Sequence, residues 1–337
     1  MKLTLKDTNI LKGVALILLL IHHLFWRNTE LYDDINLFSH YNLFQSFGVI
    51  SKCCVALFVF LSGYGLTCKY KEYEFKKKEK LLDFYSHRYL KLFFNYWLIF
   101  LLFIPVSVLS LGPSLSDTYG NNFFLRLIMD LFGISGLLNY PFYNTTWWFL
   151  SCIIGLYLLY PFLLRLLKKG YFFMLLTGSL IMSILPIDYP TKVVWLYMPV
   201  FLCGIIFEIE SFPRFSCLGG AFLLVMLCGV RLVAYYGMLL DILIAVFIIL
   251  IYAYIKIPEG IENVLCYIGK RSMLIFLFHT FIFNIWFKEF IFSSRNPLII
   301  FLLLLSFTIV LSEIVILIKK LICFDLVLKQ IELHFCH

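Results

Sequence analysis

Apolar runs of about 20 residues recur along the whole chain, and they constrain its fold more than any other feature. A helix of this length crosses the hydrocarbon core of a bilayer, because each residue advances the helix by about 1.5 Å. The chain has 337 residues, of which 62% are hydrophobic, and its mean hydropathy is +0.93. This composition is far more apolar than that of a soluble domain. The sequence therefore predicts an all-α integral membrane protein.

Ten such segments are expected to form a polytopic bundle of transmembrane helices. They cover residues 13–27, 46–66, 92–111, 146–166, 171–187, 193–209, 217–235, 236–255, 266–287 and 297–318. The first segment is not interpreted as a cleavable signal sequence, because no small-residue cleavage site follows it. We expect one membrane domain, residues 1–321, followed by a short cytoplasmic or interfacial tail, residues 322–337.

Lys and Arg are distributed unequally between the two sets of connecting segments. With the N-terminus in the cytoplasm, three quarters of the 28 Lys and Arg residues lie on inner segments. The outer minority is Arg27, Lys52, Arg126, Lys192, Arg231, Lys288 and Arg295. The positive-inside rule then predicts that both termini are cytoplasmic and that the loop 112–146 is outside. The net charge of +8 follows from this bias and does not indicate a nucleic-acid partner.

Histidines inside the predicted spans are the strongest candidates for chemistry. His23 follows Lys12 by eleven residues, which is about 16 Å along a helix and within about 20° of the same face. Lys12 is expected at the membrane surface and His23 near mid-bilayer, where ionisable groups are costly and mark functional sites. A structural histidine bonded inside the bundle is the alternative. His22 points about 80° away and is expected to be a packing or supporting residue.

His279 is the second candidate, and it follows Lys270 and Arg271 by nine and eight residues. It is therefore expected roughly 12–14 Å from the inner surface, which is nearly the predicted depth of His23. Two histidines at matched depth predict one shared cavity. The alternative is a coincidental structural histidine.

A group of cations is predicted at the inner surface near these histidines. Its members are Lys12, Arg88, Lys91, Lys270 and Arg271. Arg88 and Lys91 lie three residues apart and therefore share one helix face. Arg binds phosphate through its planar fork and Lys binds it as a point charge, so the group is suited to clamp phosphates. The alternative is that the positive-inside bias alone explains these residues.

Other residues carry weaker signals. Trp147 and Trp148 lie at the outer edge of a span, either as part of an aromatic belt or as a stacking surface for a sugar. Glu313 lies within a span and is expected to form a structural ion pair. The small residues in segment 60–65 predict close helix packing. The ten cysteines include no CxxC pair, so neither disulfides nor a metal site is expected.

Five segments follow one another in a recognisable order along the ten spans. They are NILKGVALILLLIHH, FVFLSGYGL, FYSHRYLKLFFNYW, WFLSCIIGLYLLYP and IGKRSMLIFLFH. In this order they resemble motifs of the acyltransferase 3 family, which comprises multi-pass membrane acyltransferases, mostly bacterial O-acetyltransferases. The similarity extends from about Asn9 to Leu321. The chain departs from the family pattern at Lys12, where Arg is usual, and at Ile153 and Ile154, where many members carry glutamates.

The resemblance implies transfer of an acyl group, expected to be acetyl from acetyl-CoA, to a hydroxyl of a surface polysaccharide or lipid-linked glycan. Acetyl-CoA or another acyl-CoA is then a co-substrate, and no permanently bound cofactor is expected. The group of cations would hold the phosphates, the two tryptophans the acceptor, and the two histidines would carry the chemistry. His23 is expected either to deprotonate the hydroxyl or to carry the acetyl group itself.

The expected location is the bacterial cytoplasmic membrane, with membrane lipids around the bundle. The rival function is a transporter or flippase for a glycan or small acid, with the intramembrane histidines as a proton relay. A third alternative is a non-catalytic family member that serves as a membrane partner. The sequence shows no internal repeat, which disfavours a transporter built from inverted halves.

Overall fold

The computed structural model is built from helices joined by short connections, and its described residues contain no strand. It describes residues 2–36, 41–73, 75, 77–185, 191–210, 216–234 and 237–322. Each of the ten predicted apolar segments forms a helix or a series of helices within these ranges, so the prediction of an all-α membrane protein is confirmed. The predicted interfacial tail lies outside the described residues except for Ile322.

Six helical stretches are long and apolar enough to cross a membrane. They are Leu5–Phe25 (α1), Leu43–Tyr70 (α2, Leu43–Ile50, η1, Ser51–Cys53, and α3, Cys54–Tyr70), Lys78–Leu109 (α4), Thr145–Lys168 (η4, Thr145–Trp147, and α7, Trp148–Lys168), Lys192–Ile209 (α9) and Pro297–Leu321 (α15). A bent pair would make a seventh span, formed by α12, Glu259–Lys270, with α13, Ser272–Thr280, and η5, Phe281–Trp286.

Three predicted spans form shorter apolar helices than a full crossing needs. They are α8, Phe172–Ile184, α10, Cys217–Val233, and α11, Met238–Tyr252, with 13, 17 and 15 residues. At about 1.5 Å per residue, α8 is roughly 20 Å long, short of the roughly 30 Å hydrocarbon core. By length and composition the described residues thus contain six or seven full spans, and the number ten remains a prediction.

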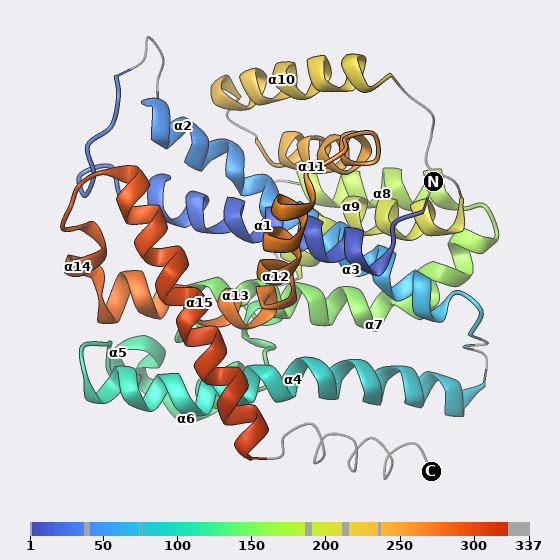
Figure 1. The fold of residues 1–337 in the computed structure, drawn as a ribbon. Helices are drawn as coiled ribbons and strands as arrows, with labels where there is room; N and C mark the ends of the chain where they lie inside the picture. The colour runs from blue at the N-terminus through green and yellow to red at the C-terminus, as the bar shows by residue number, and fades with distance from the viewer. Residues whose placement is uncertain are drawn as a thin grey trace.

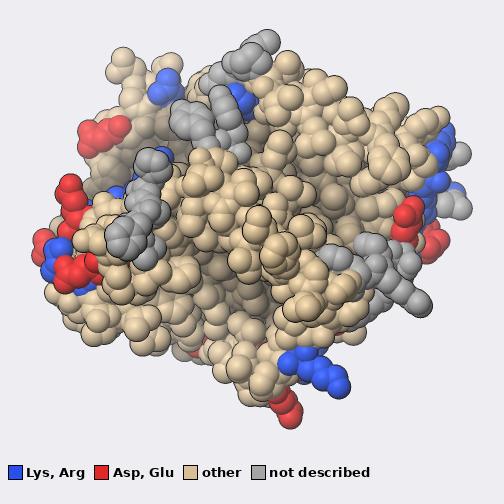
Figure 2. Space-filling view, turned by 90° about the horizontal axis from the view of Figure 1, so that it is seen from above, with Lys and Arg blue, Asp and Glu red and all other residues tan. Residues whose placement is uncertain are grey.

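The long helices lie roughly side by side, and α15 crosses them obliquely (Figure 1). The helices α10 and α11 form a pair at one side of the bundle (Figure 1). The buried ion pair between Arg231 and Asp241 joins these two helices, with 2.7 Å between Nε and Oδ1. Figure 2 shows charged side chains gathered mainly at two opposite ends, with a broad uncharged surface between them. An uncharged surface of this kind is suited to contact with lipid tails, where unpaired charges are costly.

Helices α3 and α9 cross in close contact because glycines face each other's backbones. A Cβ on Gly63 would meet the carbonyl oxygen of Phe201 at 2.5 Å. A Cβ on Gly204 would overlap the carbonyl oxygen of Phe60. The predicted close packing at the small residues of segment 60–65 is thus confirmed for Gly63, and it places α3 in the centre of the bundle.

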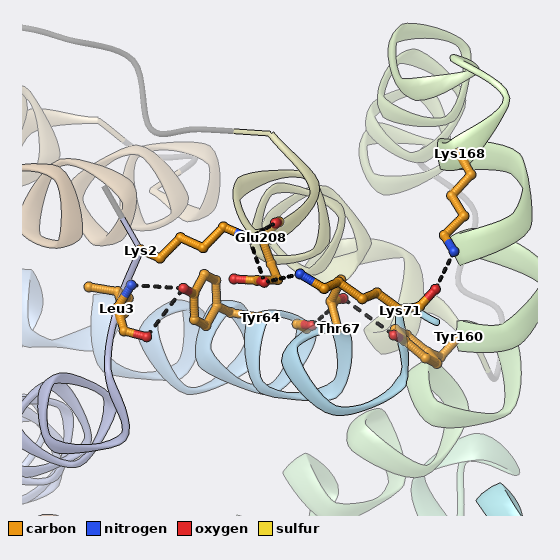
Figure 3. A network of polar contacts seen from close by, with 9 residues as sticks. Lys2, Leu3, Tyr64, Thr67, Lys71, Tyr160, Lys168 and Glu208 are labelled. Carbon is orange, nitrogen blue, oxygen red and sulfur yellow. Dashed lines mark hydrogen bonds and ion pairs between the residues drawn. The ribbon is translucent and has the colours of Figure 1, made fainter. Parts of the chain in front are cut away.

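One buried carboxylate ties the N-terminal segment to this crossing (Figure 3). Glu208 of α9 accepts from Lys2 and from Lys71, each with 2.9 Å between Nζ and Oε1. The Tyr64 hydroxyl accepts from the backbone N–H of Leu3 at 2.8 Å. These contacts hold the segment before α1 against α3 and α9 and thereby set where α1 begins.

The predicted outer loop 112–146 is a small folded lobe at one end of α4. It contains α5, Leu115–Tyr119, α6, Phe123–Leu131, and the short helix η3, Ser135–Leu137. Its centre is the fully buried Asp130, which accepts from the hydroxyls of Tyr96 at 2.9 Å and Tyr119 at 2.6 Å and from the Tyr143 N–H at 2.8 Å. Burial raises the pKa of Asp130 to about 6, although these donors oppose the rise.

Candidate active site

The C-terminal half of α1 lines a cavity of about 440 Å³, which we call the histidine cavity. Its polar and aromatic lining residues are His22, His23, Trp26, Arg27, Asn28, Lys52, Phe58, Thr145, Thr146, Trp148, Phe149, Phe276, Phe283 and Asn284. Among the residues that the structure describes, no Asp or Glu belongs to this lining. The cavity therefore presents imidazoles, hydroxyls, amides and two cations to a ligand.

The N-terminal half of α1 lines a second cavity, of about 570 Å³, which we call the cation pocket. Its cations are Lys12, Arg88, Lys91, Lys270 and Lys319. No carboxylate from the described ranges of the chain belongs to its lining. A cavity lined by one sign of charge concentrates ligands of the opposite sign, so this pocket is suited to bind a polyanion.

The close crossing of α1 and α12 brings cations together from the two ends of the sequence. A Cβ on Gly13 would overlap the backbone carbonyl of Leu265, and a Cβ on Gly269 would overlap that of Asn9. Because no side chain separates the two backbones there, Lys12 and Lys270, the neighbours of the two glycines, line the same pocket.

Helix α4 supplies another wall of the cation pocket through one continuous face. Arg88, Lys91, Leu92 and Asn95 all line the pocket, and their spacing is that of one helix face. The guanidinium of Arg88 lies over the ring of Tyr70, 4.7 Å from its centroid. The predicted shared face of Arg88 and Lys91 is confirmed.

A break in the late span directs its second half into the site. Helices α12 and α13 are bent by 64° next to Arg271, and the π-helix η5 follows α13. Phe283 and Asn284 of η5 line the histidine cavity. Broken helices line cavities in membrane proteins, and single π-helical turns occur often at functional sites.

The two predicted histidines lie next to each other, although only one of them lines a cavity. The ring centroids of His23 and His279 are 5.0 Å apart, so the predicted matched depth is confirmed. His23 lines the histidine cavity, whereas His279 is fully buried behind it. The expectation that both histidines line one shared cavity is therefore wrong for His279, because its ring packs against the backbone carbonyls of α13.

Hydrogen bonds to backbone carbonyls determine which ring nitrogen carries the hydrogen in His279 and in His22, the two imidazoles next to His23. His279 Nδ1 lies 2.9 Å from the Phe276 carbonyl oxygen and 3.2 Å from that of Ile275. A carbonyl only accepts, so neutral His279 carries its hydrogen on Nδ1, and Nε2 keeps a lone pair. This Nε2 has no hydrogen-bond partner among the described residues. By the same argument, the 2.7 Å contact to Gly48 O places the hydrogen of His22 on Nδ1.

Three phenylalanines line both cavities and separate them; we call Phe58, Phe149 and Phe276 the phenylalanine partition. They come from α3, α7 and α13. The ring centroid of Phe149 is 6.2 Å from that of Phe58 and 5.1 Å from that of Phe276. The cations of the cation pocket and the histidines of the histidine cavity thus lie on opposite sides of one aromatic layer.

Two of the predicted ligand-binding residues lie outside the cavities. Arg271 is paired with Glu313, and its guanidinium lies 3.4 Å from the ring centroid of Tyr267. This pair confirms the structural ion pair expected for Glu313. Trp147 is fully buried and donates from Nε1 to the Leu277 carbonyl at 3.0 Å, whereas its neighbour Trp148 lines the histidine cavity.

Several lining residues had no signal of their own in the sequence. Lys319 lies at the end of α15 and donates to Asn95 Oδ1 at 3.0 Å across the cation pocket. Thr145 and Thr146 enter the histidine cavity because Asn144 accepts from the Thr146 N–H at 3.0 Å. Only the tertiary packing of α15 and of the outer lobe shows that these residues belong to the sites.

The fold and these cavities define a multi-pass membrane protein with a histidine pair among its apolar helices, beside a pocket that the described residues line with cations and no acids. The family model Acyl_transf_3, described as an acyltransferase domain, matches residues 5–317. The chain therefore belongs to the acyltransferase 3 family and is a membrane acyltransferase. Searches of curated proteins and of solved structures returned no significant match.

Proposed function

We propose that the protein transfers acetyl from acetyl-CoA to a hydroxyl of a surface polysaccharide or lipid-linked glycan in the bacterial cytoplasmic membrane. The observation that carries this proposal is that the two cavities share one wall, the phenylalanine partition. On one side of it lies a pocket suited to polyanions, and on the other side lies a cavity with histidines, amides and a tryptophan. Coenzyme A matches the first chamber because its charge resides on phosphates, while its thioester lies at the end of a long neutral arm.

The donor is bound from the side of the cation pocket. Arg88 and the lysines hold the phosphates, and the neutral arm extends along α1 toward the phenylalanine partition. About 16 Å separates Lys12 from His23 along the helix, a distance that a flexible arm must span. The apolar rings of the partition favour the neutral arm and exclude the phosphates, because burying unpaired charge is costly.

The acceptor is bound in the histidine cavity, with its sugar ring against Trp148. A nitrogen of His23 takes the proton of the hydroxyl, and the oxygen attacks the thioester carbonyl. The new C–O bond forms as the C–S bond breaks, and the proton passes from His23 to the leaving thiolate, giving free CoA. Transfer through a transient acetyl-imidazole on His23 is the other route, and it leaves the overall balance unchanged.

His279 supports this chemistry from behind His23. Its Nε2 lone pair is suited to accept the N–H of His23, which would direct the other nitrogen of His23 into the cavity. His22 is fixed by Gly48 and borders the same cavity, so it serves the acceptor or the packing of the wall.

The test is acetyl transfer from labelled acetyl-CoA by the purified protein reconstituted in lipid, with glycan extracts as acceptors and mass spectrometry of the product. Lys12→Ala and Arg88→Ala should raise the KM for acetyl-CoA, since one charge-assisted hydrogen bond contributes about 1.5–3 kcal/mol. The KM for the acceptor should stay unchanged. Glycan movement across the membrane without acetyl incorporation would contradict the proposal and favour a transporter.

A further inference from the structure

The histidine cavity contains two cations that the reaction chemistry does not use. Arg27 and Lys52 both line the cavity, and both lie over the ring of Trp26, 5.5 Å from its centroid. Neither forms an ion pair with a carboxylate of a described residue. They also belong to the minority of cations predicted at the outer surface, where the positive-inside bias gives no reason for them.

The other polar residues of the lining can form hydrogen bonds with a sugar, but none of those described is a counterion for Arg27 or Lys52. Thr145, Thr146, Asn28 and Asn284 supply hydroxyl and amide groups, and no Asp or Glu of the described part of the chain lines the cavity. Two cations in a partly enclosed cavity, without a carboxylate from these residues, produce a positive potential that attracts an anion. Their contacts with Trp26 hold the two side chains in place before a ligand arrives.

We propose that the acceptor is an anionic glycan, whose carboxylate or phosphate is bound by Arg27 and Lys52 next to the hydroxyl that is acylated. The position of the charge follows from the lining of the cavity. His23 lies in the last turn of α1, Arg27 lies two residues beyond the end of that helix, and both line the histidine cavity. The anionic group therefore lies on the acylated sugar or on its immediate neighbour. The statement that the bound glycan is the acyl acceptor rests on the proposed function. The preference of the cavity for anionic sugars does not.

The experiment measures binding and does not depend on turnover. The protein is placed in nanodiscs of phosphatidylcholine, and dissociation constants are measured for methyl glucoside, methyl glucuronide and glucose 1-phosphate. We expect the two anionic sugars to bind at least about tenfold more tightly than the neutral one, as one charge-assisted hydrogen bond would allow. Added salt should weaken this preference. The relative affinity of the carboxylate and the phosphate identifies the source of the charge.

Variants show whether the two cations carry the preference. In the double variant Arg27→Gln, Lys52→Gln, the affinity for the anionic sugars should fall to that for the neutral sugar. Arg27→Lys should retain most of the preference for anionic sugars. Lys288→Gln is the matched control, because Lys288 is an exposed cation at the same end of the bundle and does not line the cavity. Methyl glucoside binding reports whether the double variant has kept its fold.

Two results would overturn the inference: equal affinity for charged and neutral sugars, or an unchanged preference in the double variant. A third result would also overturn it: loss of the preference when phosphatidylglycerol is added to the nanodisc, because Arg27 and Lys52 would then bind a lipid headgroup. Failure of the proposed reaction is distinguishable from this, because it would appear as absent acetyl transfer in a protein that still binds anionic sugars.

Discussion

At the scale of single residues, the site depends on how three neighbouring imidazoles are placed. His23 is flanked by His22, with 5.2 Å between ring centroids, and by His279, with 5.0 Å. Backbone carbonyls orient both flanking rings, so their tautomers are fixed before a substrate binds. His23 is the one of the three that both lines the cavity and contacts a second histidine with an unpartnered nitrogen.

His23→Ala should abolish acyl transfer while the protein still inserts and folds. Loss of a general base or nucleophile typically lowers the rate by at least about a hundredfold. His22→Ala should reduce activity much less, because His22 borders the cavity without contacting His279. A glycan acetylation assay, with expression and monodispersity checked by detergent chromatography, measures both variants. A larger loss for His22→Ala than for His23→Ala would show that the wrong imidazole was assigned.

His279→Asn tests the supporting role separately. We expect kcat to fall and the pH profile of kcat to change, because the variant lacks the imidazole Nε2 that we propose as the acceptor for the N–H of His23. The KM for acetyl-CoA should stay the same, since His279 does not line the cation pocket. A merely structural role would instead lower the amount of folded protein and leave the pH profile of the remainder unchanged.

At the scale of helices, contacts between backbones decide which side chains share a pocket. The crossing of α1 and α12 has no room for a Cβ at Gly13, because the obstacle is a backbone carbonyl that cannot rotate away. The outer lobe is held by Asn144, which donates to Thr280 Oγ1 at 2.6 Å, and by Trp147. Asn144 is buried, so these bonds are shielded from solvent.

Gly13→Ala should destabilise the protein by about 1–3 kcal/mol, the usual cost of overpacking a close contact. It should also raise the KM for acetyl-CoA, because α1 and α12 must separate and carry Lys12 and Lys270 apart. Gly65→Ala is the control, since a Cβ at Gly65 meets nothing within 4 Å. Thermal unfolding in detergent and donor kinetics measure the two effects. Equal behaviour of the two variants would show that the crossing tolerates a side chain.

Asp130 predicts a pH dependence for the outer lobe. Burial raises its pKa to about 6, above the ordinary value of 3.8, so the folded state binds its proton more tightly than the unfolded state. The free energy of unfolding should therefore fall as pH rises from about 4 to about 6 and then change little. Asp130→Asn cannot change charge and should lack this component. Thermal unfolding at several pH values compares the two proteins, and identical pH slopes would contradict the assignment.

At the scale of the whole molecule, the two cavities occupy opposite halves of α1 with the phenylalanine partition between them. This arrangement allows a donor and an acceptor to arrive from different sides of a membrane. Whether they do so depends on the orientation of the bundle, which the cation bias of the sequence predicts with the N-terminus inside and the outer lobe outside.

Ser116 in the outer lobe tests that orientation. It is exposed in α5, so a cysteine placed there should react with a membrane-impermeant maleimide in intact cells. The native Cys68, exposed near the far end of α3, should react only after the cells are permeabilised. Labelling of Ser116→Cys only after permeabilisation would reverse the predicted topology.

Much of the fold was predictable because each apolar run encodes its own helix. Hydropathy identified the helical segments. Helix periodicity predicted one face for Lys12 and His23, and in the structure each of them lines a cavity beside α1. Hydropathy did not distinguish full spans from the shorter helices α8, α10 and α11, since breaks depend on local packing. Arg271 and Trp147 were grouped with ligand-binding residues, but partners from other parts of the chain, Glu313 and Leu277, direct them elsewhere.

The sequence by itself determined that this protein is a helical membrane acyltransferase, and it predicted that His23 and a group of cations carry the chemistry. Those features depend on composition, periodicity and motif order, which act within one segment. Only the tertiary structure decided that His279 lies behind His23, that three phenylalanines divide the site, and that Arg27 and Lys52 face a cavity lined by no acid of the described residues. Such relations arise where helices distant in sequence cross, and close backbone contacts at a few glycines determine those crossings.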